Sequence, residues 1–277
     1  MTRATLSEVL ILARAEGRAV AGLVCLGWED ARAYRDAAQA LGVPVILQAG
    51  PGCRAHTPIP VLAEMFRTLA EECDVPVVAH LDHGYAADEC RAAIAAGFTS
   101  VMFDGSSLPL DENIARTAEI AAMAHDAGIS CEGEIGFVGY AAGAESRGTD
   151  PGEAARFAAE TGVDAMAVSV GNLHLRTEAG PGLDEDRIAA IAAVTEVPLV
   201  IHGGSGVPHA QRARLARDTA ICKFNIGTEL RQSFGTALRQ VLADDPEAFD
   251  RAAILSAVEP SLRDAAMAVL RSLEAPC

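Results

Sequence analysis

Short apolar segments alternate with longer amphipathic segments eight times along this chain, and this repeat constrains the fold more than any other feature. The short segments are rich in Val, Ile and Leu, and the long ones in Ala, Glu and Arg. The pattern is typical of parallel strands that are buried on both faces and connected by helices. We expect strands at Ala19–Leu26, Val43–Ala49, Val75–His83, Ser100–Asp104, Ile129–Gly136, Ala165–Val170, Leu199–His202 and Ile221–Ile226. We expect helices at Glu29–Leu41, Ile59–Glu72, Ala86–Ala96, Leu110–Ala127, Pro151–Thr161, Asp184–Thr195, Pro208–Arg217 and Thr228–Ala243.

The number and length of these repeats favour a closed barrel over an open sheet. Eight β-α units in about 250 residues match a (β/α)8 barrel in size and count. An open doubly wound sheet would carry G-x-G-x-x-G after its first strand, which this chain lacks. The Ala, Leu and Val spacing of Pro246–Ala275 predicts one or two further helices. Because no linker rich in Pro, Ser or charge divides the chain, we interpret residues 1–277 as a single α/β domain, a TIM barrel with extra C-terminal helices.

Charge and cysteine content argue against several classes of partner and compartment. The formal net charge is −16, with 22 Lys and Arg against 38 Asp and Glu and no basic run, which argues against nucleic acid or an anionic membrane as partner. The N-terminal residues have helix-like polarity and include an acid, unlike a signal or transit peptide, and no apolar run is long enough to span a bilayer. We expect a cytoplasmic protein with reduced thiols, because no C-x-x-C pair occurs among its cysteines at 25, 53, 73, 90, 131, 222 and 277.

Three histidines, His83, His174 and His202, each follow an apolar segment where an expected strand ends. In a barrel the loops after the strands form the active site, so these imidazoles can approach one another from different walls. Three nitrogen donors on rigid elements suit a tetrahedral zinc ion with one open position. Each histidine alone is more often a hydrogen-bonded packing residue, so only their shared position favours a metal site. Asp82, beside His83, is either a proton carrier or a carboxylate that orients a ligand.

Two strand-to-helix turns in the second half of the chain have the composition of anion sites. In His202–Pro208 the glycines let the backbone approach an anion, and the proline suits the first turn of the following helix. Lys223–Thr228 ends the eighth strand with polar groups at another helix start. Taken alone, the glycine pair of the first turn could be only a tight connection. Because barrels usually hold phosphate at the loops after strands seven and eight, we predict a phosphate site shared by both turns.

Six ordered motifs resemble the class II, metal-dependent ketose-bisphosphate aldolases, and the tagatose-bisphosphate type more than the longer fructose-bisphosphate type. The motifs are Ala79–Gly84, Ser100–Ser106 with Glu112–Ile114, Glu132–Gly136, Gly171 with His174, His202–Gly206 and Lys223–Arg231. The resemblance implies Zn²⁺ bound by His83, His174 and His202, with Asp82 as proton donor and acceptor. Zinc would be the electron sink of carbon–carbon cleavage, so no lysine Schiff base is required.

The same resemblance implies how a phosphorylated sugar substrate is held. Its dihydroxyacetone phosphate half would contact the residues Gly203, Gly204, Ser205, Asn225, Ile226, Gly227 and Thr228. A monovalent cation, Na⁺ or K⁺, is often present near the phosphate in this family. The usual glycine after His174 is Leu175 here, whose backbone amide could still face the phosphate.

Two further departures from the family pattern bear on the aldehyde half of the substrate. The asparagine that usually ends strand one is Val24, and the Ser or Thr that usually follows strand two is Gly50. Both changes remove polar groups from the region of the substrate carbons, and a missing hydrogen-bonding partner changes discrimination strongly. We therefore predict an aldehyde half that is smaller, less polar or has a different distal group.

The loop after Gly136 lacks the Gly-Gly-Glu type of acid found in relatives. Its only carboxylate before Arg147 is Glu145, which we assign as the general base for the carbon proton. The glycines of this loop permit the backbone changes of a lid, although an ordinary solvated connection is the alternative. We assign Asp104 and Glu134 as carboxylates that lie behind the metal ligands and orient them.

Three functions remain open at this stage. The first is reversible retro-aldol cleavage of a phosphorylated ketose to dihydroxyacetone phosphate and an aldehyde. The second is a zinc-dependent hydrolase on the same barrel, although it lacks the expected His-x-His and would leave the phosphate site unused. The third is a catalytically impaired barrel that serves as a binding or assembly subunit. The apolar segment Ala252–Leu273 predicts self-association as a homodimer or homotetramer.

Overall fold

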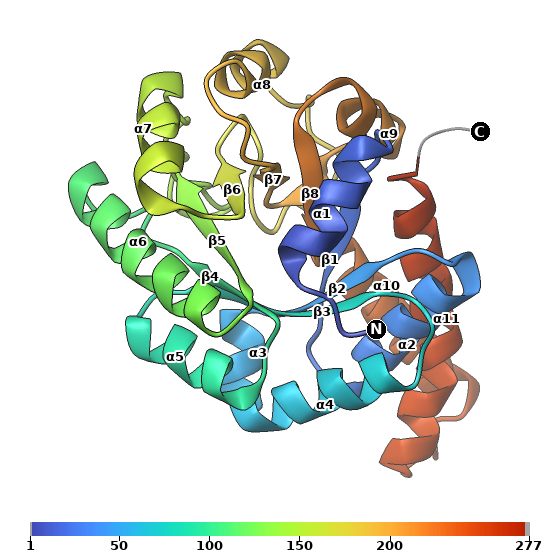
Figure 1. Cartoon of the computed structure of the whole chain (residues 1–277). Coiled ribbons are helices and arrows are strands. Elements are labelled where there is room, and N and C mark those ends of the chain that lie inside the picture. The colour runs from blue at the N-terminus through green and yellow to red at the C-terminus, as the bar shows by residue number, and fades with distance from the viewer. Residues whose placement is uncertain (1, 275–277) are drawn as a thin grey trace.

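The computed structural model describes residues 2–274 and contains a closed barrel of eight parallel strands (Figure 1). Each strand pairs with its neighbours in chain order, and β1 closes the ring by pairing with β8. This arrangement confirms the predicted TIM barrel. The strands are β1 Val20–Val24, β2 Val45–Ala49, β3 Val77–Gly84, β4 Ser100–Phe103, β5 Ser130–Ile135, β6 Ala165–Val168, β7 Leu199–Ile201 and β8 Ile221–Ile226.

Helices surround the barrel, and eight of them lie within three residues of the predicted bounds. The helices are α1 Leu6–Ala15, α2 Trp28–Leu41, α3 Pro51–His56, α4 Ile59–Glu71, α5 Ala87–Ala96, α6 Leu110–Asp126, α7 Pro151–Thr161, α8 Glu185–Ala192, α9 His209–Asp218, α10 Thr228–Asp244 and α11 Arg251–Arg271. The C-terminal extension forms the single helix α11 within the described residues, and the end of the predicted segment at Ala275 lies outside them, as does Cys277. The short helix α3 was not anticipated.

Helix α1 closes the N-terminal end of the barrel. It begins with a capping box between Thr5 and Glu8, which satisfies backbone donors of its first turn. Its buried face packs against strand residues such as Val20, Ile46, Val78, Met102 and Val200. The opposite, C-terminal end of the strands is therefore the end that is left for a site, as is usual in this architecture.

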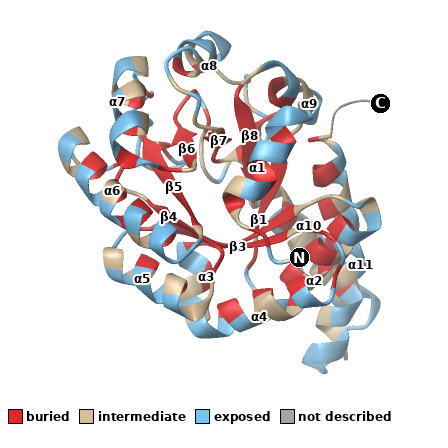
Figure 2. Ribbon diagram, in the orientation of Figure 1, coloured by how far each residue is buried: buried red, intermediate tan, exposed pale blue. Residues whose placement is uncertain are grey.

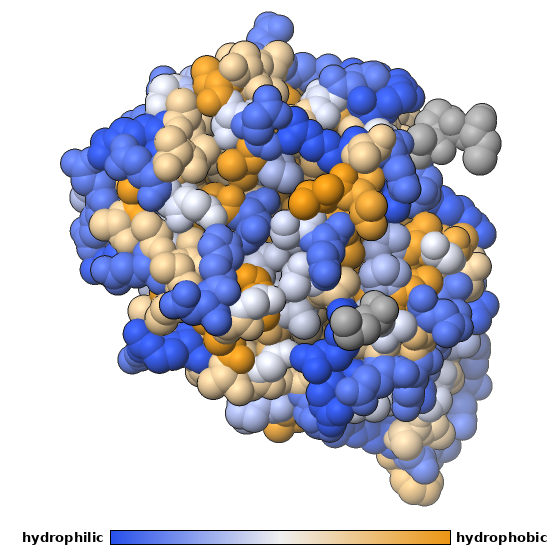
Figure 3. Space-filling view, in the orientation of Figure 1, coloured by the Kyte–Doolittle hydropathy of each residue, from blue (hydrophilic) through white to orange (hydrophobic). Residues whose placement is uncertain are grey.

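The main core lies between the strands and the outer helices. Figure 2 shows buried strands ringed by helices whose outer faces are exposed. Helix α11 packs against α2 and α10, and its buried residues are Val258, Leu262, Ala266, Val269 and Leu270. Figure 3 shows a largely hydrophilic surface with a few hydrophobic patches on the face that α1 covers. Within residues 2–274, no helix combines the length and apolar character needed to cross a membrane.

Candidate active site

The three histidines converge at the C-terminal end of the barrel. His83 lies in β3, His174 in the loop after β6, and His202 directly after β7. Their ring centroids are 4.6 Å apart for His83 and His202, 5.2 Å for His83 and His174, and 5.7 Å for His174 and His202. One nitrogen from each ring lies within 4.8 Å of the others. This spacing allows one metal ion to contact all three rings.

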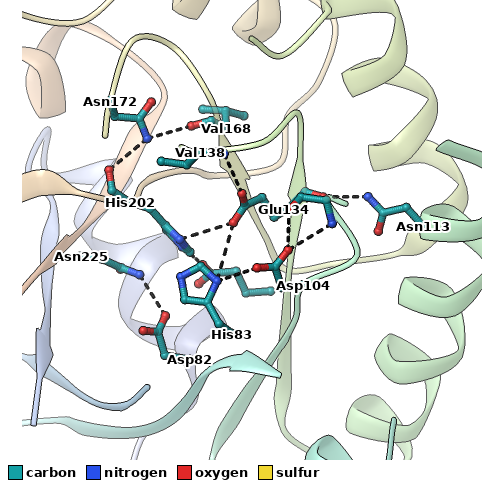
Figure 4. A network of polar contacts seen from close by, with 12 residues as sticks. Asp82, His83, Asp104, Asn113, Glu134, Val138, Val168, Asn172, His202 and Asn225 are labelled. Atoms are coloured by element: carbon teal, nitrogen blue, oxygen red, sulfur yellow. Dashed lines mark hydrogen bonds and ion pairs between the residues drawn. The ribbon is translucent and has the colours of Figure 1, made fainter. Parts of the chain in front are cut away.

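Two carboxylates, Asp104 and Glu132, fix which nitrogens of the His83 and His202 rings face inward. His83 donates from Nδ1 to Asp104 Oδ2 at 2.7 Å, which leaves its Nε2 available (Figure 4). His202 donates from Nε2 to Glu132 Oε1 at 2.9 Å. Its Nδ1 is buried without a hydrogen-bond partner, 3.5 Å from Glu134 Oε2, which has no hydrogen-bond partner either. A buried polar atom without a partner is costly unless it binds a ligand. The donor set therefore fits a metal ion, and hydrogen-bonded carboxylates behind histidine ligands are typical of such sites.

The ionisable side chains of this cluster lie close together and shift one another's pKa values. Burial lowers the pKa of His83, but the carboxylates of Asp82, Asp104 and Glu134 outweigh this and raise it to about 10. Burial and the neighbouring His83 cation lower the pKa of His174 to about 4. Burial and the charge of Asp104 raise the pKa of Glu134 to about 8. The carboxylates thus favour a positive charge at His83, whereas His174 and His202 are held neutral.

Arg54 on α3 holds the end of β3 and was not identified from the sequence. The backbone of His83 has φ of 52°, in the left-handed region that is unfavourable for residues other than glycine. Arg54 donates to the carbonyl oxygens of Asp82 at 2.6 Å and of His83 at 2.9 Å. It also donates to the carbonyl of Ala49 at the end of β2. The guanidinium therefore stabilises the backbone conformation that turns His83 toward the other two histidines.

Asp82 lies beside the histidines and faces the space left by Gly50 in the lining of the active-site cavity. Its side chain accepts a hydrogen bond from Asn225 Nδ2 at 3.2 Å and is nearly buried. A Cβ atom at Gly50 would lie 3.4 Å from Asp82 Oδ2, so the glycine leaves space directly in front of this carboxylate. Both Asp82 and Gly50 line the cavity that contains His83. A substrate hydroxyl in that space would be within reach of Asp82.

The two predicted anion segments meet on one side of the same cavity. Ser205 Oγ accepts hydrogen bonds from the amides of Gly227 at 3.4 Å and Glu229 at 3.3 Å, which joins the turn after β7 to the start of α10. The cavity lining includes Leu175, Gly203, Ser205, Asn225, Gly227 and Thr228. Ile226 is fully buried behind them, and its side chain packs where a Cβ of Gly204 would lie. The start of α10 thus lies at the cavity, as in many anion sites, and two of its amides, those of Gly227 and Glu229, are bonded to Ser205.

A fully buried arginine, Arg212 of α9, lies behind these segments and was also missed by sequence reasoning. Its guanidinium donates to the carbonyls of Gly204 at 3.1 Å and Val207 at 3.0 Å. It also pairs with Glu229 Oε1 at 2.7 Å and reaches Ser272 at the end of α11. Arg212 therefore links the turn after β7 to α10 through buried, charge-assisted hydrogen bonds.

The loop after β5 crosses the cavity through Tyr140 and not through Glu145. Tyr140 lines the cavity, and its ring centroid lies 5.0 Å from that of His174. The amide of Ala141 donates to the carbonyl of His174, whose own amide donates to Gly139. Glu145 is exposed and does not line the cavity in this conformation. Its assigned role as base therefore requires movement of the loop and stays a prediction.

Comparison with known proteins identifies the family. The family model described as fructose-bisphosphate aldolase class-II matches residues 4–275. This chain belongs to the class II aldolase family. Its membership explains why a histidine cluster and two anion-compatible turns occur together at one end of the barrel.

The names of the relatives of this class II aldolase refer to more than one substrate. The 6-phospho-5-dehydro-2-deoxy-D-gluconate aldolase of Shouchella clausii (strain KSM-K16) is 44% identical over 179 residues, which span 64% of this chain and 61% of that protein. The probable fructose-bisphosphate aldolase of Bacillus subtilis (strain 168) is 34% identical over 98% of this chain and 97% of its own. The crystal structure of the YdjI aldolase from Escherichia coli K12 superimposes with a TM-score of 0.85 at 28% identity, covering 98% of this chain and 97% of that one. Aldolase function is common to all three.

The only lysine of this class II aldolase, Lys223, is fully buried inside the barrel. Its Nζ lies 2.6 Å from Glu132 Oε2 and 3.3 Å from His80 Nε2. The sequence had not indicated a desolvated lysine, and the structure corrects this because β8 turns Lys223 inward. The ion pair nevertheless occupies the amine, and Glu132 uses its other oxygen on His202. Lys223 therefore supports a candidate metal ligand, His202, through Glu132 and is not placed as a free nucleophile.

Proposed function

We propose that this class II aldolase catalyses reversible retro-aldol cleavage of a phosphorylated ketose to dihydroxyacetone phosphate and an aldehyde. The observation that carries the proposal is the convergence of three histidines with a buried, unpartnered His202 Nδ1 in a cavity beside two anion-compatible segments. A zinc-type divalent ion held by His83, His174 and His202 would supply a Lewis acid for the negative charge that develops on the ketone oxygen. Asp104 and Glu134 would orient this ligand set from behind.

Asp82 is the residue we assign to proton transfer at the substrate hydroxyl. In the cleavage direction it would accept the hydroxyl proton of the carbon that becomes the aldehyde, and in the synthesis direction it would return it. Its hydrogen bond from Asn225 fixes the carboxylate, and the absence of a side chain at Gly50 gives the hydroxyl access. Glu145 remains our assignment for the carbon proton of the three-carbon half, provided that its loop closes over the cavity.

The phosphate of the three-carbon half would lie against Gly203–Ser205 and Asn225–Thr228, with the amide of Leu175 nearby. The left-handed backbone of Gly203 and Leu175, with φ of 63° and 57°, is consistent with amides turned toward a ligand. A Na⁺ or K⁺ ion near the phosphate is part of this proposal. The net charge of −16 makes such a local amide site more important, because the surrounding field repels anions.

The aldehyde half would lie toward Val24 and Arg231. The Val24 side chain offers no hydrogen bond to a hydroxyl. Arg231 lines the cavity, and its guanidinium makes no hydrogen bond or ion pair to any residue from 2 to 274. A substrate with a methylene near Val24 and an anionic distal group near Arg231 fits both features. Retro-aldol cleavage of a 6-phospho-5-dehydro-2-deoxygluconate gives such an aldehyde, with a methylene and a carboxylate. We therefore infer this class of keto acid phosphate as substrate, in preference to hexose bisphosphates.

Neither alternative function gains support from the site or the relatives. A hydrolase would leave the phosphate segments without a role, and a binding subunit would not need the carboxylates that orient His83 and His202. We also treat the chain as one domain, since the family match spans residues 4–275. A cytoplasmic location and a homo-oligomeric state complete the proposal.

A substrate panel on the metal-loaded enzyme tests the proposal directly. Release of dihydroxyacetone phosphate would be measured from fructose 1,6-bisphosphate, tagatose 1,6-bisphosphate and 6-phospho-5-dehydro-2-deoxygluconate at equal concentration. We expect the highest kcat/KM for the deoxy keto acid. Higher kcat/KM for either hexose bisphosphate would refute the assignment of the aldehyde half, and the absence of aldol products from all three would refute the proposed reaction.

A further inference from the structure

His174 differs from the other two candidate ligands in how its ring is held. The ring of His83 bonds to Asp104, and the ring of His202 bonds to Glu132. In the described part of the chain, no side chain makes a hydrogen bond or ion pair to the His174 ring. Groups behind a ligand fix its orientation and thereby strengthen metal binding. The orientation of the third ring must therefore come from packing and from its backbone.

The loop after β5 is folded into a short hairpin, residues 137–147, which we call the Tyr140 hairpin. Phe137 and Arg147 exchange backbone hydrogen bonds of 2.8 and 2.9 Å and form an antiparallel bridge at its base. Near the tip, the amide of Tyr140 donates to the carbonyl of Ala144 at 3.0 Å. Hydrogen bonds at both ends thus give the hairpin a defined backbone.

Two contacts attach the base of the Tyr140 hairpin to carboxylates of the site. The amide of Val138 donates to Glu134 Oε1 at 3.2 Å. The Arg147 guanidinium donates to the carbonyl of Ser106 at 3.1 Å, and the Ser106 hydroxyl donates to Asp104 Oδ1 at 2.6 Å. The base of the hairpin is therefore fixed relative to the two carboxylates that lie beside the histidines.

The tip of the hairpin contacts His174 through both backbone and ring. The amide of His174 donates to the carbonyl of Gly139 at 2.8 Å, and its carbonyl accepts from the amide of Ala141 at 3.0 Å. The Tyr140 ring, between these two bonds, has its centroid 5.0 Å from that of the His174 ring, with the planes 31° apart. Aromatic rings at this separation attract and orient each other. Tyr140 thus packs against the one candidate ligand that has no carboxylate partner.

A second tyrosine of the cavity provides an internal comparison. Tyr85 lies over His83, with ring centroids 6.2 Å apart and planes 28° apart, and it lines the same cavity as Tyr140. The His83 ring is already fixed by its short bond to Asp104. Loss of the Tyr85 ring should therefore disturb its neighbouring ligand much less than loss of the Tyr140 ring.

We propose that Tyr140 is a positioning residue for the third metal ligand, and that its ring holds the His174 imidazole in the orientation that a metal ion requires. The inference rests on the metal site of the proposed function and adds a residue to it. Metal affinity then depends on the position of the Tyr140 hairpin, because displacement of the hairpin would remove both the ring contact and the two backbone bonds of His174.

Zn²⁺ affinity of the purified enzyme, measured by competition with a chelator, tests this role. Tyr140→Ala should bind Zn²⁺ about tenfold to a hundredfold more weakly, the usual effect of losing a group that orients a ligand. Tyr140→Phe keeps the ring and should restore the affinity to within about threefold of wild type. Tyr85→Ala is the matched comparison and should also stay within about threefold. Circular dichroism would confirm that each variant is folded.

The visible absorption of the cobalt-loaded enzyme is a readout that a general loss of stability would not change. Co²⁺ held by three imidazoles in a four-coordinate site absorbs strongly, and replacement of an imidazole by water weakens and shifts the absorption. In Tyr140→Ala we expect weaker absorption, because an unsupported His174 ring leaves the ion for part of the time. Tyr140→Phe and Tyr85→Ala should keep the wild-type spectrum.

The outcomes separate the positioning role from the metal site itself. Unchanged Zn²⁺ affinity in Tyr140→Ala, or weaker affinity with an unchanged cobalt spectrum, would overturn the role of Tyr140 and leave the three-histidine site standing. An equal loss of affinity in Tyr85→Ala would also overturn it, since any ring lining the cavity would then have the same effect. A wild type that binds no divalent ion would overturn this inference together with the proposed function.

Discussion

Nε2 of His202 lies 2.9 Å from Oε1 of Glu132, and the other oxygen of Glu132 lies 2.6 Å from Nζ of Lys223. Burial lowers the pKa of His202, so its ring is neutral and carries one proton. That proton lies on Nε2, which donates a hydrogen bond to Glu132, and Nδ1 is left without one. All three side chains are fully buried, so water does not compete for these bonds. The tautomer of a candidate metal ligand is thus set by a chain of contacts that starts inside the barrel.

Replacing His202 by alanine should abolish metal binding and activity together. The ring offers the one candidate ligand nitrogen that is buried with no hydrogen-bond partner, and two remaining histidines bind a divalent ion much more weakly. Metal content after dialysis would be measured by elemental analysis, with circular dichroism to confirm folding. His125→Ala is the control, because this exposed histidine pairs with Asp164 on the outer surface. Full metal occupancy in His202→Ala would remove it from the ligand set.

The variant Asp82→Asn should keep the metal and lose about 10²- to 10⁴-fold in kcat, the usual range for a positioned acid-base group. The amide retains the size of the side chain but cannot accept the substrate proton. Steady-state cleavage rates and metal content would be measured on the same preparation. Unchanged turnover would exclude Asp82 from proton transfer.

Chelation, and not Schiff-base trapping, should inactivate this enzyme. Lys223 is the only lysine and is buried in an ion pair, so borohydride added with a ketose phosphate should trap no adduct detectable by mass spectrometry. Lys223→Met would leave the buried charge of Glu132 uncompensated, and we expect this to lower the free energy of unfolding by about 3–5 kcal/mol. A covalent adduct at Lys223 would contradict the assignment to metal-dependent chemistry.

Arg212→Met should raise KM for the phosphorylated substrate about tenfold to a hundredfold and change kcat much less. The guanidinium positions the turn that contains Gly204 relative to α10, and a small displacement of such a cradle is costly. Arg214→Met is the matched control, because Arg214 lies two residues further along α9 and pairs with Glu185 on the surface. Affinity for unphosphorylated dihydroxyacetone should stay the same in both variants. A loss of kcat at constant KM would indicate a general structural defect instead.

The double variant Val24→Asn with Gly50→Ser should shift specificity toward hexose bisphosphates. It restores the polar groups that relatives present to the substrate carbons, and hydrogen-bonded discrimination can be large. The ratio of kcat/KM for fructose 1,6-bisphosphate to that for the deoxy keto acid phosphate would be compared with wild type, and we expect at least about a tenfold rise. An unchanged ratio would mean that other residues set the preference.

Sequence alone anticipated the barrel because its signal is local. Each strand is an apolar run bounded by polar turns, and β8 was placed at Ile221–Ile226 without error. The histidines were identifiable for the same reason, since His83 and His202 stand at the end of such a run and His174 follows one within four residues. Glu134 and Asp104 were assigned by resemblance, and the structure places both near His83.

Long-range contacts were beyond the reach of the sequence. Arg54 and Arg212 lie on helices with the composition of ordinary surface segments, and their importance depends on carbonyls that are brought to them by folding. The sequence did not indicate that Lys223 is buried. In a strand of six residues, a single charged residue does not show which face of the strand points into the barrel. The apolar character of Ala252–Leu273, which suggested self-association, is largely explained by packing of α11 on α2 and α10.

The position of α1 at the N-terminal end of the barrel affects how substrate and products exchange during turnover. The interior of the barrel is packed, and α1 covers its N-terminal end. Ketose, aldehyde and three-carbon phosphate would therefore all pass through the opening beside Tyr140. A new ketose molecule cannot enter until both products have left. Either product, if it dissociates slowly, therefore competes with the substrate for the same opening. We expect both products to inhibit the enzyme for this reason.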